Sequence, residues 1–305
     1  MPIAYLPYKQ IDKTKWDACV AKARNQLIYG FSYYLDNMAT NWDGLVLNDY
    51  EAVMPLPWRK KFQIRYLYQP PFTQQGGIFS SARITGDITK AFIEASATQF
   101  KFAEIALNYG NEIIVENDIP IVLRKNNILL LHDYENILRN YGDSFKKSLK
   151  RVNKFNMLYQ SSYDHASVID LYENLYTKRQ SSVKADDYLN FRKLCDLLAQ
   201  SDKVITRLAY DKEKNLLAAS VLLRDNTRMY NLISCVTDSG KRLEANYFLY
   251  DKLIQEFSGK GLSLDLEGSE VKGIAAFYKK FNPILESYPF IRYNNLHPLL
   301  KLVKH

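Results

Sequence analysis

The spacing of apolar and polar residues predicts alternating helices and strands along the whole chain. In the first half, apolar residues recur at helical intervals over 13–22 and 32–38, and over a long amphipathic stretch, 88–107. Shorter apolar and β-branched runs predict strands over 44–47, 50–58, 64–68, 77–79, 112–116 and 127–131. The first half is therefore expected to combine helices with a sheet.

The second half repeats this order of elements, although it does not repeat residue identities. Helices are expected over 166–179, 186–200, 245–257 and 273–281, and strands over 204–210, 216–224, 228–236 and 262–267. Two helices, an antiparallel meander, a helix, a strand and a helix resemble the plan of GNAT-type acyltransferases. We therefore expect an α/β (α+β) fold of two tandem GNAT-like domains. Each would be a mixed, mainly antiparallel sheet flanked by helices, with a cleft between the domains.

The predicted boundaries are 1–141 for the first domain and 142–287 for the second. The run 288–305 is expected to return and pack on the first domain, as the tail of the family resembled below does.

Composition limits the classes of partner and site. The net charge of +8 favours anionic partners, which include nucleic acid, nucleotide-linked substrates and anionic membrane. Three distant cysteines and four scattered histidines encode neither a disulfide framework nor a metal site. No signal sequence and no run of about twenty apolar residues is present, so we expect a soluble, cytoplasmic protein without a spanning helix.

The segment 142–155 is the most cationic part of the chain. Phe145, Leu149 and Val152 form one apolar stripe of a helix, and the cations lie away from it. These cations are Lys146, Lys147, Lys150, Arg151 and Lys154. Such a surface is either an ordinary solvated face or a binding site for phosphates.

An ordered series of segments resembles the Fem (FemABX) aminoacyltransferases over about residues 127–283. The series runs NNILLLHDY, YGDSFKKSLKRVNKFNM, LLAASVLL, RMYNLISCV, NYFLYDKLIQEF, GLSLDLEGS and FYKKFNP, and the first 120 residues match only in organisation. Fem enzymes transfer an amino acid from aminoacyl-tRNA to an amine of a peptidoglycan precursor peptide. The resemblance implies that the donor's phosphates are held by Lys147, Lys150, Arg151 and Lys154, with no tightly bound cofactor.

The segment 262–267 is the second candidate site. Strand alternation places Asp265 and Glu267 on one face, where they and the following Ser269 would hold an acceptor amine or remove its proton. The alternative is that both carboxylates pair with cations such as Arg207 or Lys279. The resemblance also implies a lysine that stabilises developing negative charge. Lys279 takes that place in one register and Tyr278 in another.

The loop 237–248 lies where GNAT acetyltransferases bind the pyrophosphate of coenzyme A on backbone amides. Gly240, Lys241 and Arg242 are its candidate binding residues. A pyrophosphate loop is rich in glycine, and this one has a single glycine. Acyl-coenzyme A is therefore the less favoured donor, and an ordinary charged loop is the third interpretation.

The segment 68–79 offers polar groups to a substrate through Tyr68, Gln69, Gln74 and Gln75. Its Pro-Pro and Gly-Gly pairs are equally consistent with a sharp connection between strands. Nearby, Asp36 and Asn37 occupy the place where Fem enzymes often present a lysine to the precursor's phosphate. That difference argues against the cell-wall precursor itself.

Three functions remain from sequence alone. The first is a Fem-type transfer from aminoacyl-tRNA to the amine of a small molecule or peptide. The second is an acyl-coenzyme A-dependent N-acyltransferase, and the third is a non-catalytic binding protein on the same fold. No pattern in the sequence indicates the acceptor or the oligomeric state.

Overall fold

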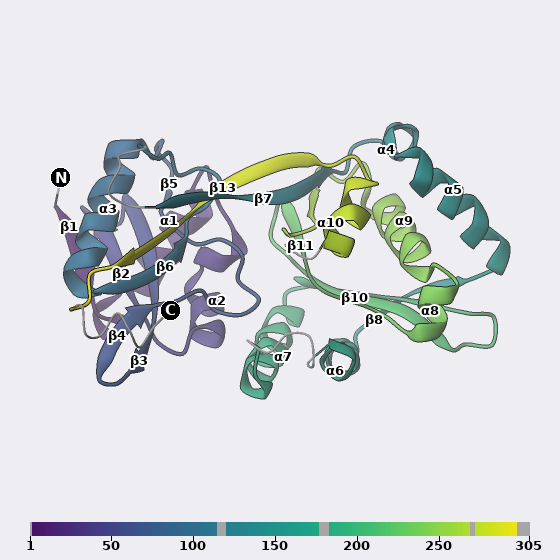
Figure 1. The fold of residues 1–305 in the computed structure, drawn as a ribbon, viewed down its shortest axis with the longest axis horizontal. Coiled ribbons are helices and arrows are strands. Elements are labelled where there is room, and N and C mark those ends of the chain that lie inside the picture. Colours follow the sequence, from purple (N-terminus) through teal and green to yellow (C-terminus); the bar gives the residue numbers. More distant parts are fainter. Residues whose placement is uncertain (1, 115–119, 177–182, 269–271, 298–305) are drawn as a thin grey trace. The chain divides into compact units, whose positions relative to one another are not determined.

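The computed structural model describes residues 2–114, 120–176, 183–268 and 272–297. The chain divides into two compact units (Figure 1). Unit 1 contains residues 1–124 and 287–305, and unit 2 contains residues 125–286. The division into domains at 141 and 142 stays a prediction, and the units are described separately below.

Unit 1 is built on a mixed sheet. Its strands follow the order β1-β2-β3-β4-β6-β13, with β5 paired to β3. The strands are β1 (Ile3–Leu6), β2 (Trp42–Leu47), β3 (Ala52–Lys61), β4 (Ile64–Leu67), β5 (Phe79–Ser80), β6 (Phe102–Ala106) and β13 (Ile284–Asn294). All pairs are antiparallel except β4 with β6. The last strand, β13, pairs with β6 through Phe290–Asn294, so unit 1 includes a segment that follows unit 2 in sequence.

Three α-helices pack on this sheet, together with the short 3-10 turns Tyr8–Gln10 and Ile28–Gly30. They are α1 (Lys13–Lys22), α2 (Ser32–Met38) and α3 (Gly86–Gln99). Helix α3 contacts β1 and β2, and α1 contacts β3 and β5. The core between α3 and the sheet includes Phe92, Phe100, Ile105 and Ile291.

Two expectations for the first half were wrong. The predicted helix 88–107 ends at Gln99, and its last part is strand β6. Residues 102–106 are held as a strand because they pair with β13 on one side and β4 on the other. The predicted strand 112–116 is absent from its described part, 112–114, and residues 115 and 116 lie outside the described residues.

The strands of unit 2 form a mixed sheet in the order β7-β12-β11-β10-β9-β8. Its strands are β7 (Ile121–Leu130), β8 (Leu158–Ser162), β9 (Val204–Tyr210), β10 (Leu216–Arg224), β11 (Arg228–Val236) and β12 (Ser263–Asp265). Strand β7 begins in unit 1 and continues into unit 2. Only the β11–β12 pair is parallel among these neighbours.

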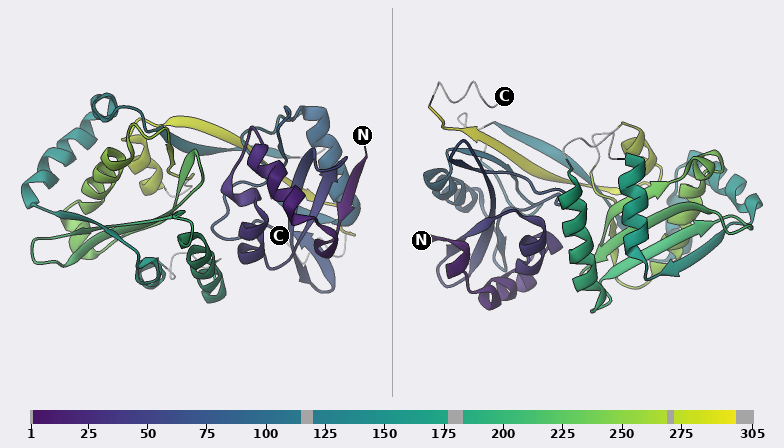
Figure 2. Two further views of the ribbon diagram at one scale, coloured as in Figure 1. Left: turned by 180° about the vertical axis from the view of Figure 1, so that it is seen from behind. Right: turned by 90° about the horizontal axis from the view of Figure 1, so that it is seen from below.

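Helices cover both faces of the sheet in unit 2 (Figures 1 and 2). On one face lie α5 (Asp143–Val152), which continues as a 3-10 turn over Asn153–Phe155, α9 (Ala245–Phe257) and α10 (Lys272–Lys279). On the other face lie α6 (His165–Tyr176) and α7 (Ala185–Ala199). The short helices α4 (Tyr134–Asn140) and α8 (Asp238–Arg242) complete the unit.

The core of unit 2 is aromatic where α5, α9 and α10 meet. Phe145 of α5 packs on Tyr247 of α9 and on Phe281, which follows α10. All three side chains are buried, so the apolar stripe predicted for 142–155 does face the core. No helix within the described residues has the length and apolar character needed to cross a membrane.

Candidate functional site

The sheet of unit 2 opens between β11 and β12. The two strands pair from Arg228 to Tyr230, whereas β11 continues to Val236 and β12 ends at Asp265. The register of β11 against β10 shifts at the same place, from Tyr230 opposite Leu223 to Ile233 opposite Val221. This shift is a β-bulge at residues 231 and 232, and bulges of this kind are over-represented beside active sites.

The side chain at the bulge, Asn231, belongs to a buried polar cluster. Its amide nitrogen donates to the hydroxyls of Tyr250 (2.7 Å) and Tyr278 (3.2 Å). Its amide oxygen is buried and has no hydrogen-bond partner among the described residues. Burial raises the pKa of both tyrosines, so their hydroxyls stay protonated near neutral pH.

Asp265 ends β12 and is completely buried. One of its carboxylate oxygens accepts from Asn126 (3.0 Å) and from the Arg228 guanidinium (2.9 Å). The other oxygen accepts from the backbone N–H of Glu267 at 2.9 Å. Burial raises the pKa of Asp265 to about 6, against the opposing attraction of Arg228.

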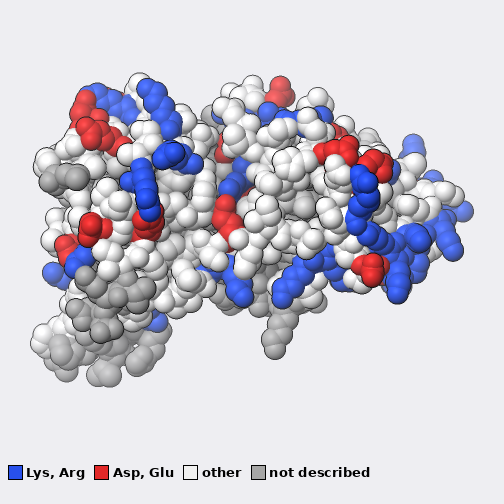
Figure 3. Space-filling view, turned by 90° about the horizontal axis from the view of Figure 1, so that it is seen from above, with Lys and Arg blue, Asp and Glu red and all other residues white. Residues whose placement is uncertain are grey.

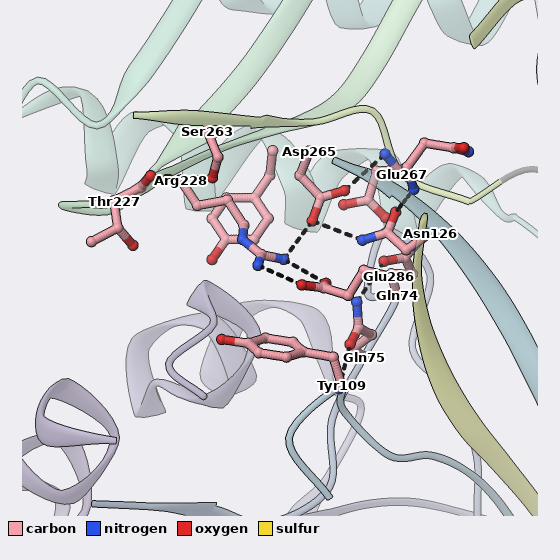
Figure 4. A network of polar contacts seen from close by, with 12 residues as sticks. Gln74, Gln75, Tyr109, Asn126, Thr227, Arg228, Ser263, Asp265, Glu267 and Glu286 are labelled. Atoms are coloured by element: carbon pink, nitrogen blue, oxygen red, sulfur yellow. Dashed lines mark hydrogen bonds and ion pairs between the residues drawn. The ribbon is translucent and has the colours of Figure 1, made fainter. Parts of the chain in front are cut away.

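Arg228 connects two carboxylates. Figure 4 shows its guanidinium between Asp265 and Glu286, and it donates to the two oxygens of Glu286 at 3.0 and 3.1 Å. The sequence suggested Arg207 or Lys279 as partners for the acidic pair. Arg207 instead pairs with Glu256, and the cation beside Asp265 is Arg228.

Glu267 follows Asp265 in a strained conformation. Its φ is +62°, which non-glycine residues seldom adopt, and its backbone N–H is held by Asp265. Its carboxylate is half-buried and helps to raise the pKa of Tyr278, after the larger effect of burial. Ser269, the third residue expected here, lies outside the described residues.

Tyr278 near the end of helix α10 differs in burial from the two lysines that follow it. Tyr278 points into the buried cluster, whereas Lys279 is exposed at the end of the helix. Lys280 donates to the hydroxyl of Tyr247 at 2.5 Å. Of the two registers that the sequence allows, the one with Tyr278 places a side chain near the bulge.

The cations of α5 gather on the surface of unit 2. Figure 3 shows Lys and Arg side chains over this helix, at the right of the view. Lys147, Lys150 and Lys154 are exposed. Arg151 is instead bound to both carboxylate oxygens of Glu244, at 2.9 and 2.8 Å. Three of the four predicted phosphate-binding cations therefore face solvent, and the fourth is in an ion pair.

The residues of the loop after β11 bond to one another and pack against β10. Thr237 caps α8 by accepting from the N–H of Gly240 at 3.0 Å, and Gly240 lies against the backbone of β10. A Cβ at position 240 would come within 2.0 Å of the Leu217 carbonyl oxygen, so the glycine allows close packing. Lys241 pairs with Asp238, and Arg242 donates to Ser239.

A carboxylate lies at the start of α9. Glu244 is its N-cap residue, and hydrogen bonds from Arg151 hold the pKa of Glu244 below its usual value. The Glu244 carboxylate therefore pairs with Arg151 and makes no capping hydrogen bond to α9.

The polar residues of the segment 68–79 lie in unit 1 and bond mainly to one another and to nearby backbone. Tyr68 and Gln69 line a cavity of about 30 Å³. Gln75 is fully buried: its amide donates to Gln74 at 2.9 Å, and it accepts from the backbone N–H of Tyr109 at 3.0 Å (Figure 4). These contacts are those of an ordered connection between strands.

The nearby carboxylate of Asp36 borders a larger hollow of about 220 Å³. It is bound by Lys13 at 2.7 Å and by the indole N–H of Trp42 at 3.0 Å.

Comparison with solved structures gives the fold. The crystal structure of FemX superposes with a TM-score of 0.68 and 12% identity, with 100% of both chains covered. The chain has the fold of FemX. A tandem GNAT protein from the clavulanic acid biosynthesis pathway gives a TM-score of 0.55 and 9% identity, over 97% of this chain and 99% of that one.

A further match is a conserved protein of unknown function from Bacteroides thetaiotaomicron. It has a TM-score of 0.59 and 10% identity, over 94% of this chain and 99% of that one. Neither protein-family models nor curated protein sequences gave a match. The FemX likeness confirms the predicted fold class, two tandem GNAT-like halves with mixed sheets flanked by helices.

Several residues of the candidate site were not found from the sequence. Asn126 and Glu286 lie far along the chain from Arg228 and Asn231, which share β11, and the cluster forms only in the folded sheet. One sequence signal was present: Arg228 is the one charged residue of the strand 228–236 and stands at its start.

Proposed function

We propose that this chain is a Fem-type N-acyltransferase that moves an aminoacyl group from aminoacyl-tRNA to an amine. The observation that carries the proposal is the opening of β11 from β12 at the bulge, with Glu267 two residues past the end of the short strand. An acyl donor lying along the free edge of β11 would meet backbone groups that have no partner in β12. Its carbonyl would then be close to the only strained acidic residue of the described segment 263–268.

The choice of donor rests on the phosphate-binding groups. The exposed Lys147, Lys150 and Lys154 form a cationic surface suited to a polyphosphate chain. The loop at Gly240 is packed on β10, and its cations Lys241 and Arg242 bond to residues of the same loop. Both features favour tRNA over coenzyme A as the carrier of the acyl group.

The proposed step is direct attack of the acceptor amine on the ester carbonyl of the donor. A C–N bond forms, the C–O bond to the ribose breaks, and the proton lost by the amine ends on the leaving ribose oxygen. Glu267 is assigned the transient removal of that proton. Asp265 already accepts three hydrogen bonds, so it is assigned the positioning of Glu267 and Arg228.

The stabilisation of negative charge expected of Lys279 stays a prediction, because the side chain of this residue is exposed to solvent. The acceptor is an amine in a small molecule or a peptide. A cell-wall precursor is the less favoured acceptor because Asp36 and its partner Lys13 neutralise each other where a free lysine would hold a phosphate.

The decisive experiment measures tRNA binding and aminoacyl transfer with the same variants. Replacing Lys147, Lys150 and Lys154 by Gln should weaken tRNA binding and reduce the slope of log K against log salt by about 2–3. Transfer of labelled amino acid from charged tRNA to a panel of amines should fall in parallel.

The matched control replaces three exposed lysines elsewhere in unit 2, Lys193, Lys212 and Lys214, by Gln. This control has the same net charge and should retain the salt slope. Equal losses in both variants would contradict a site on α5. Thermal stabilisation by acetyl-coenzyme A would replace the proposal with the coenzyme A-dependent alternative, and transfer from neither donor would favour the binding protein.

A further inference from the structure

The hairpin of β3 and β4 ends in an unusual turn. Lys61 pairs with Ile64, so Phe62 and Gln63 are the two turn residues (Figure 1). Both have positive φ, +48° and +65°, which defines the turn that hairpins normally make from Asn-Gly or Asp-Gly. A bulky aromatic residue is a conformational outlier at such a position.

The Phe62 ring is also the most exposed phenylalanine side chain among the large apolar residues described, with 70% of its surface accessible. The hairpin therefore keeps a strained backbone and an exposed ring at the same residue. Neither feature contributes to the core of unit 1. Strain of this kind clusters at functional sites, so the pairing of strain with exposure suggests a role for Phe62.

The sequence around the turn is strongly basic. From Ala52 to Gly86 the chain contains no Asp and no Glu. Arg59 and Arg65 each make a hydrogen bond within unit 1: Arg59 donates to Thr40, and Arg65 donates to Tyr5. Lys60 and Lys61 are exposed, and the Lys61 ammonium lies 5.4 Å from the centroid of the Phe62 ring.

We infer that this hairpin tip, Lys60–Gln63, docks the protein onto an anionic phospholipid bilayer. The order of groups along the hairpin supports a bilayer over a nucleic acid. Phe62 is outermost, and Lys61 and Lys60 stand about 3 and 7 Å behind it at the rise of a β-strand. This matches the depth order of a membrane surface, in which the ring enters the interface while the ammonium groups meet the headgroups.

A nucleic acid would require a different arrangement. Single-stranded bases stack on aromatic rings that lie in a cationic groove. Here the ring projects from the end of a two-stranded hairpin, beyond its cations. The inference depends on neither the donor nor the acceptor of the proposed reaction, so each can fail without the other.

The test uses the full chain and flotation with vesicles. One set is phosphatidylcholine alone, and the other contains about a quarter phosphatidylglycerol. Binding is expected only to the anionic vesicles and should weaken with salt. Phe62→Asn should reduce the partition coefficient about tenfold, and each of Lys60→Gln and Lys61→Gln about fivefold.

The Phe62→Asn variant separates docking from folding, because Asn tolerates positive φ better than Phe. Its thermal midpoint should be equal to or above that of the native chain while its vesicle binding falls. The matched controls are Tyr163→Asn, an aromatic residue that is 96% exposed, and the pair Lys193→Gln with Lys212→Gln. These controls should bind vesicles like the native chain.

Three outcomes would overturn the inference. They are equal binding to both kinds of vesicle, no loss in the Phe62→Asn variant, and equal losses in the controls. If the lysine variants lose tRNA affinity while vesicle binding is unchanged, the hairpin is a nucleic-acid contact instead.

Discussion

At the scale of single residues, the central feature is a buried carboxylate whose partners come from distant strands. Asp265 and Glu267 were predicted from strand alternation to share a face, and the sequence alone suggested similar roles for both. Their environments differ: Asp265 is enclosed by three donors, and Glu267 is half-buried with a strained backbone. The difference depends on Asn126 and Arg228, whose proximity follows from sheet pairing and is not encoded locally.

Arg228→Met should destabilise unit 2 strongly. Removing the guanidinium leaves the buried charge of Asp265 without its main counterion, which costs about 3–5 kcal/mol of unfolding free energy near neutral pH. The measurement is urea unfolding. The comparison is Arg207→Met, which breaks a more exposed ion pair with Glu256. This variant should lose less unfolding free energy than Arg228→Met.

The loss of unfolding free energy in Arg228→Met should become smaller as the pH falls from about 7 to about 5. The pKa of Asp265 is about 6 in the folded chain against an ordinary value of 3.8, so the folded state binds this proton more tightly. A raised carboxylate pKa means that stability increases as pH falls through the folded value toward the unfolded one. Without Arg228 the pKa of Asp265 rises further, so its uncompensated charge is neutralised at a higher pH. A deficit that grows with acidity would contradict this assignment.

Glu267 allows its chemical and conformational roles to be separated. Glu267→Gln should lower aminoacyl transfer about 10²–10⁴-fold with little change in stability, because only the proton acceptor is lost. Glu267→Gly should lose the same activity and gain about 1 kcal/mol in unfolding free energy, because glycine relieves the positive φ. Activity retained by both variants would remove Glu267 from the mechanism.

At the scale of elements, the close packing of α8 on β10 depends on one glycine. Gly240→Ala should lower the unfolding free energy by about 2–4 kcal/mol, because its Cβ would meet the backbone oxygen of Leu217. Gly273→Ala in α10 is the matched control, since nothing lies within 4 Å of its Cβ position. The control should be neutral or slightly stabilising by calorimetry. Similar losses in both would mean that the close approach to the Leu217 oxygen does not explain the effect.

Most elements were predicted because their local pattern and their final packing agree. Strands β9, β10 and β11 and helices α1, α2 and α9 begin and end where the periodicity placed them. Strand β6 was predicted as helix because 88–107 keeps apolar residues at helical spacing on both sides of Gln99. Strands β1, β8 and β13 were not predicted as strands, since each is defined by the neighbour with which it pairs.

At the scale of the whole molecule, unit 1 is assembled from two separate stretches of sequence, whereas unit 2 is continuous. Ile291 and Tyr293 of β13 lie in the core of unit 1, and Tyr293 bonds to Ser96 of α3 at 3.0 Å. Ending the chain at Glu286 would remove these side chains and leave the edge of β6 unpaired.

The truncated chain should lose about 5 kcal/mol or more in unit 1 while unit 2 keeps its own unfolding transition. Scanning calorimetry of the full chain, the truncated chain and the fragment 125–286 measures this. The fragment should reproduce the transition that survives truncation. If both transitions fell together on truncation, the two units would not be independent in stability.

The late position of β13 also sets an order for folding on the ribosome. Synthesis reaches β6 first, then all of unit 2, and only afterwards the residues 290–294 that pair with β6. At about 5–20 residues per second, the edge of β6 waits on the order of ten seconds or more for its partner. The unit that is begun first is therefore finished last, and during that interval its open edge is where a chaperone would be most useful to a nascent chain.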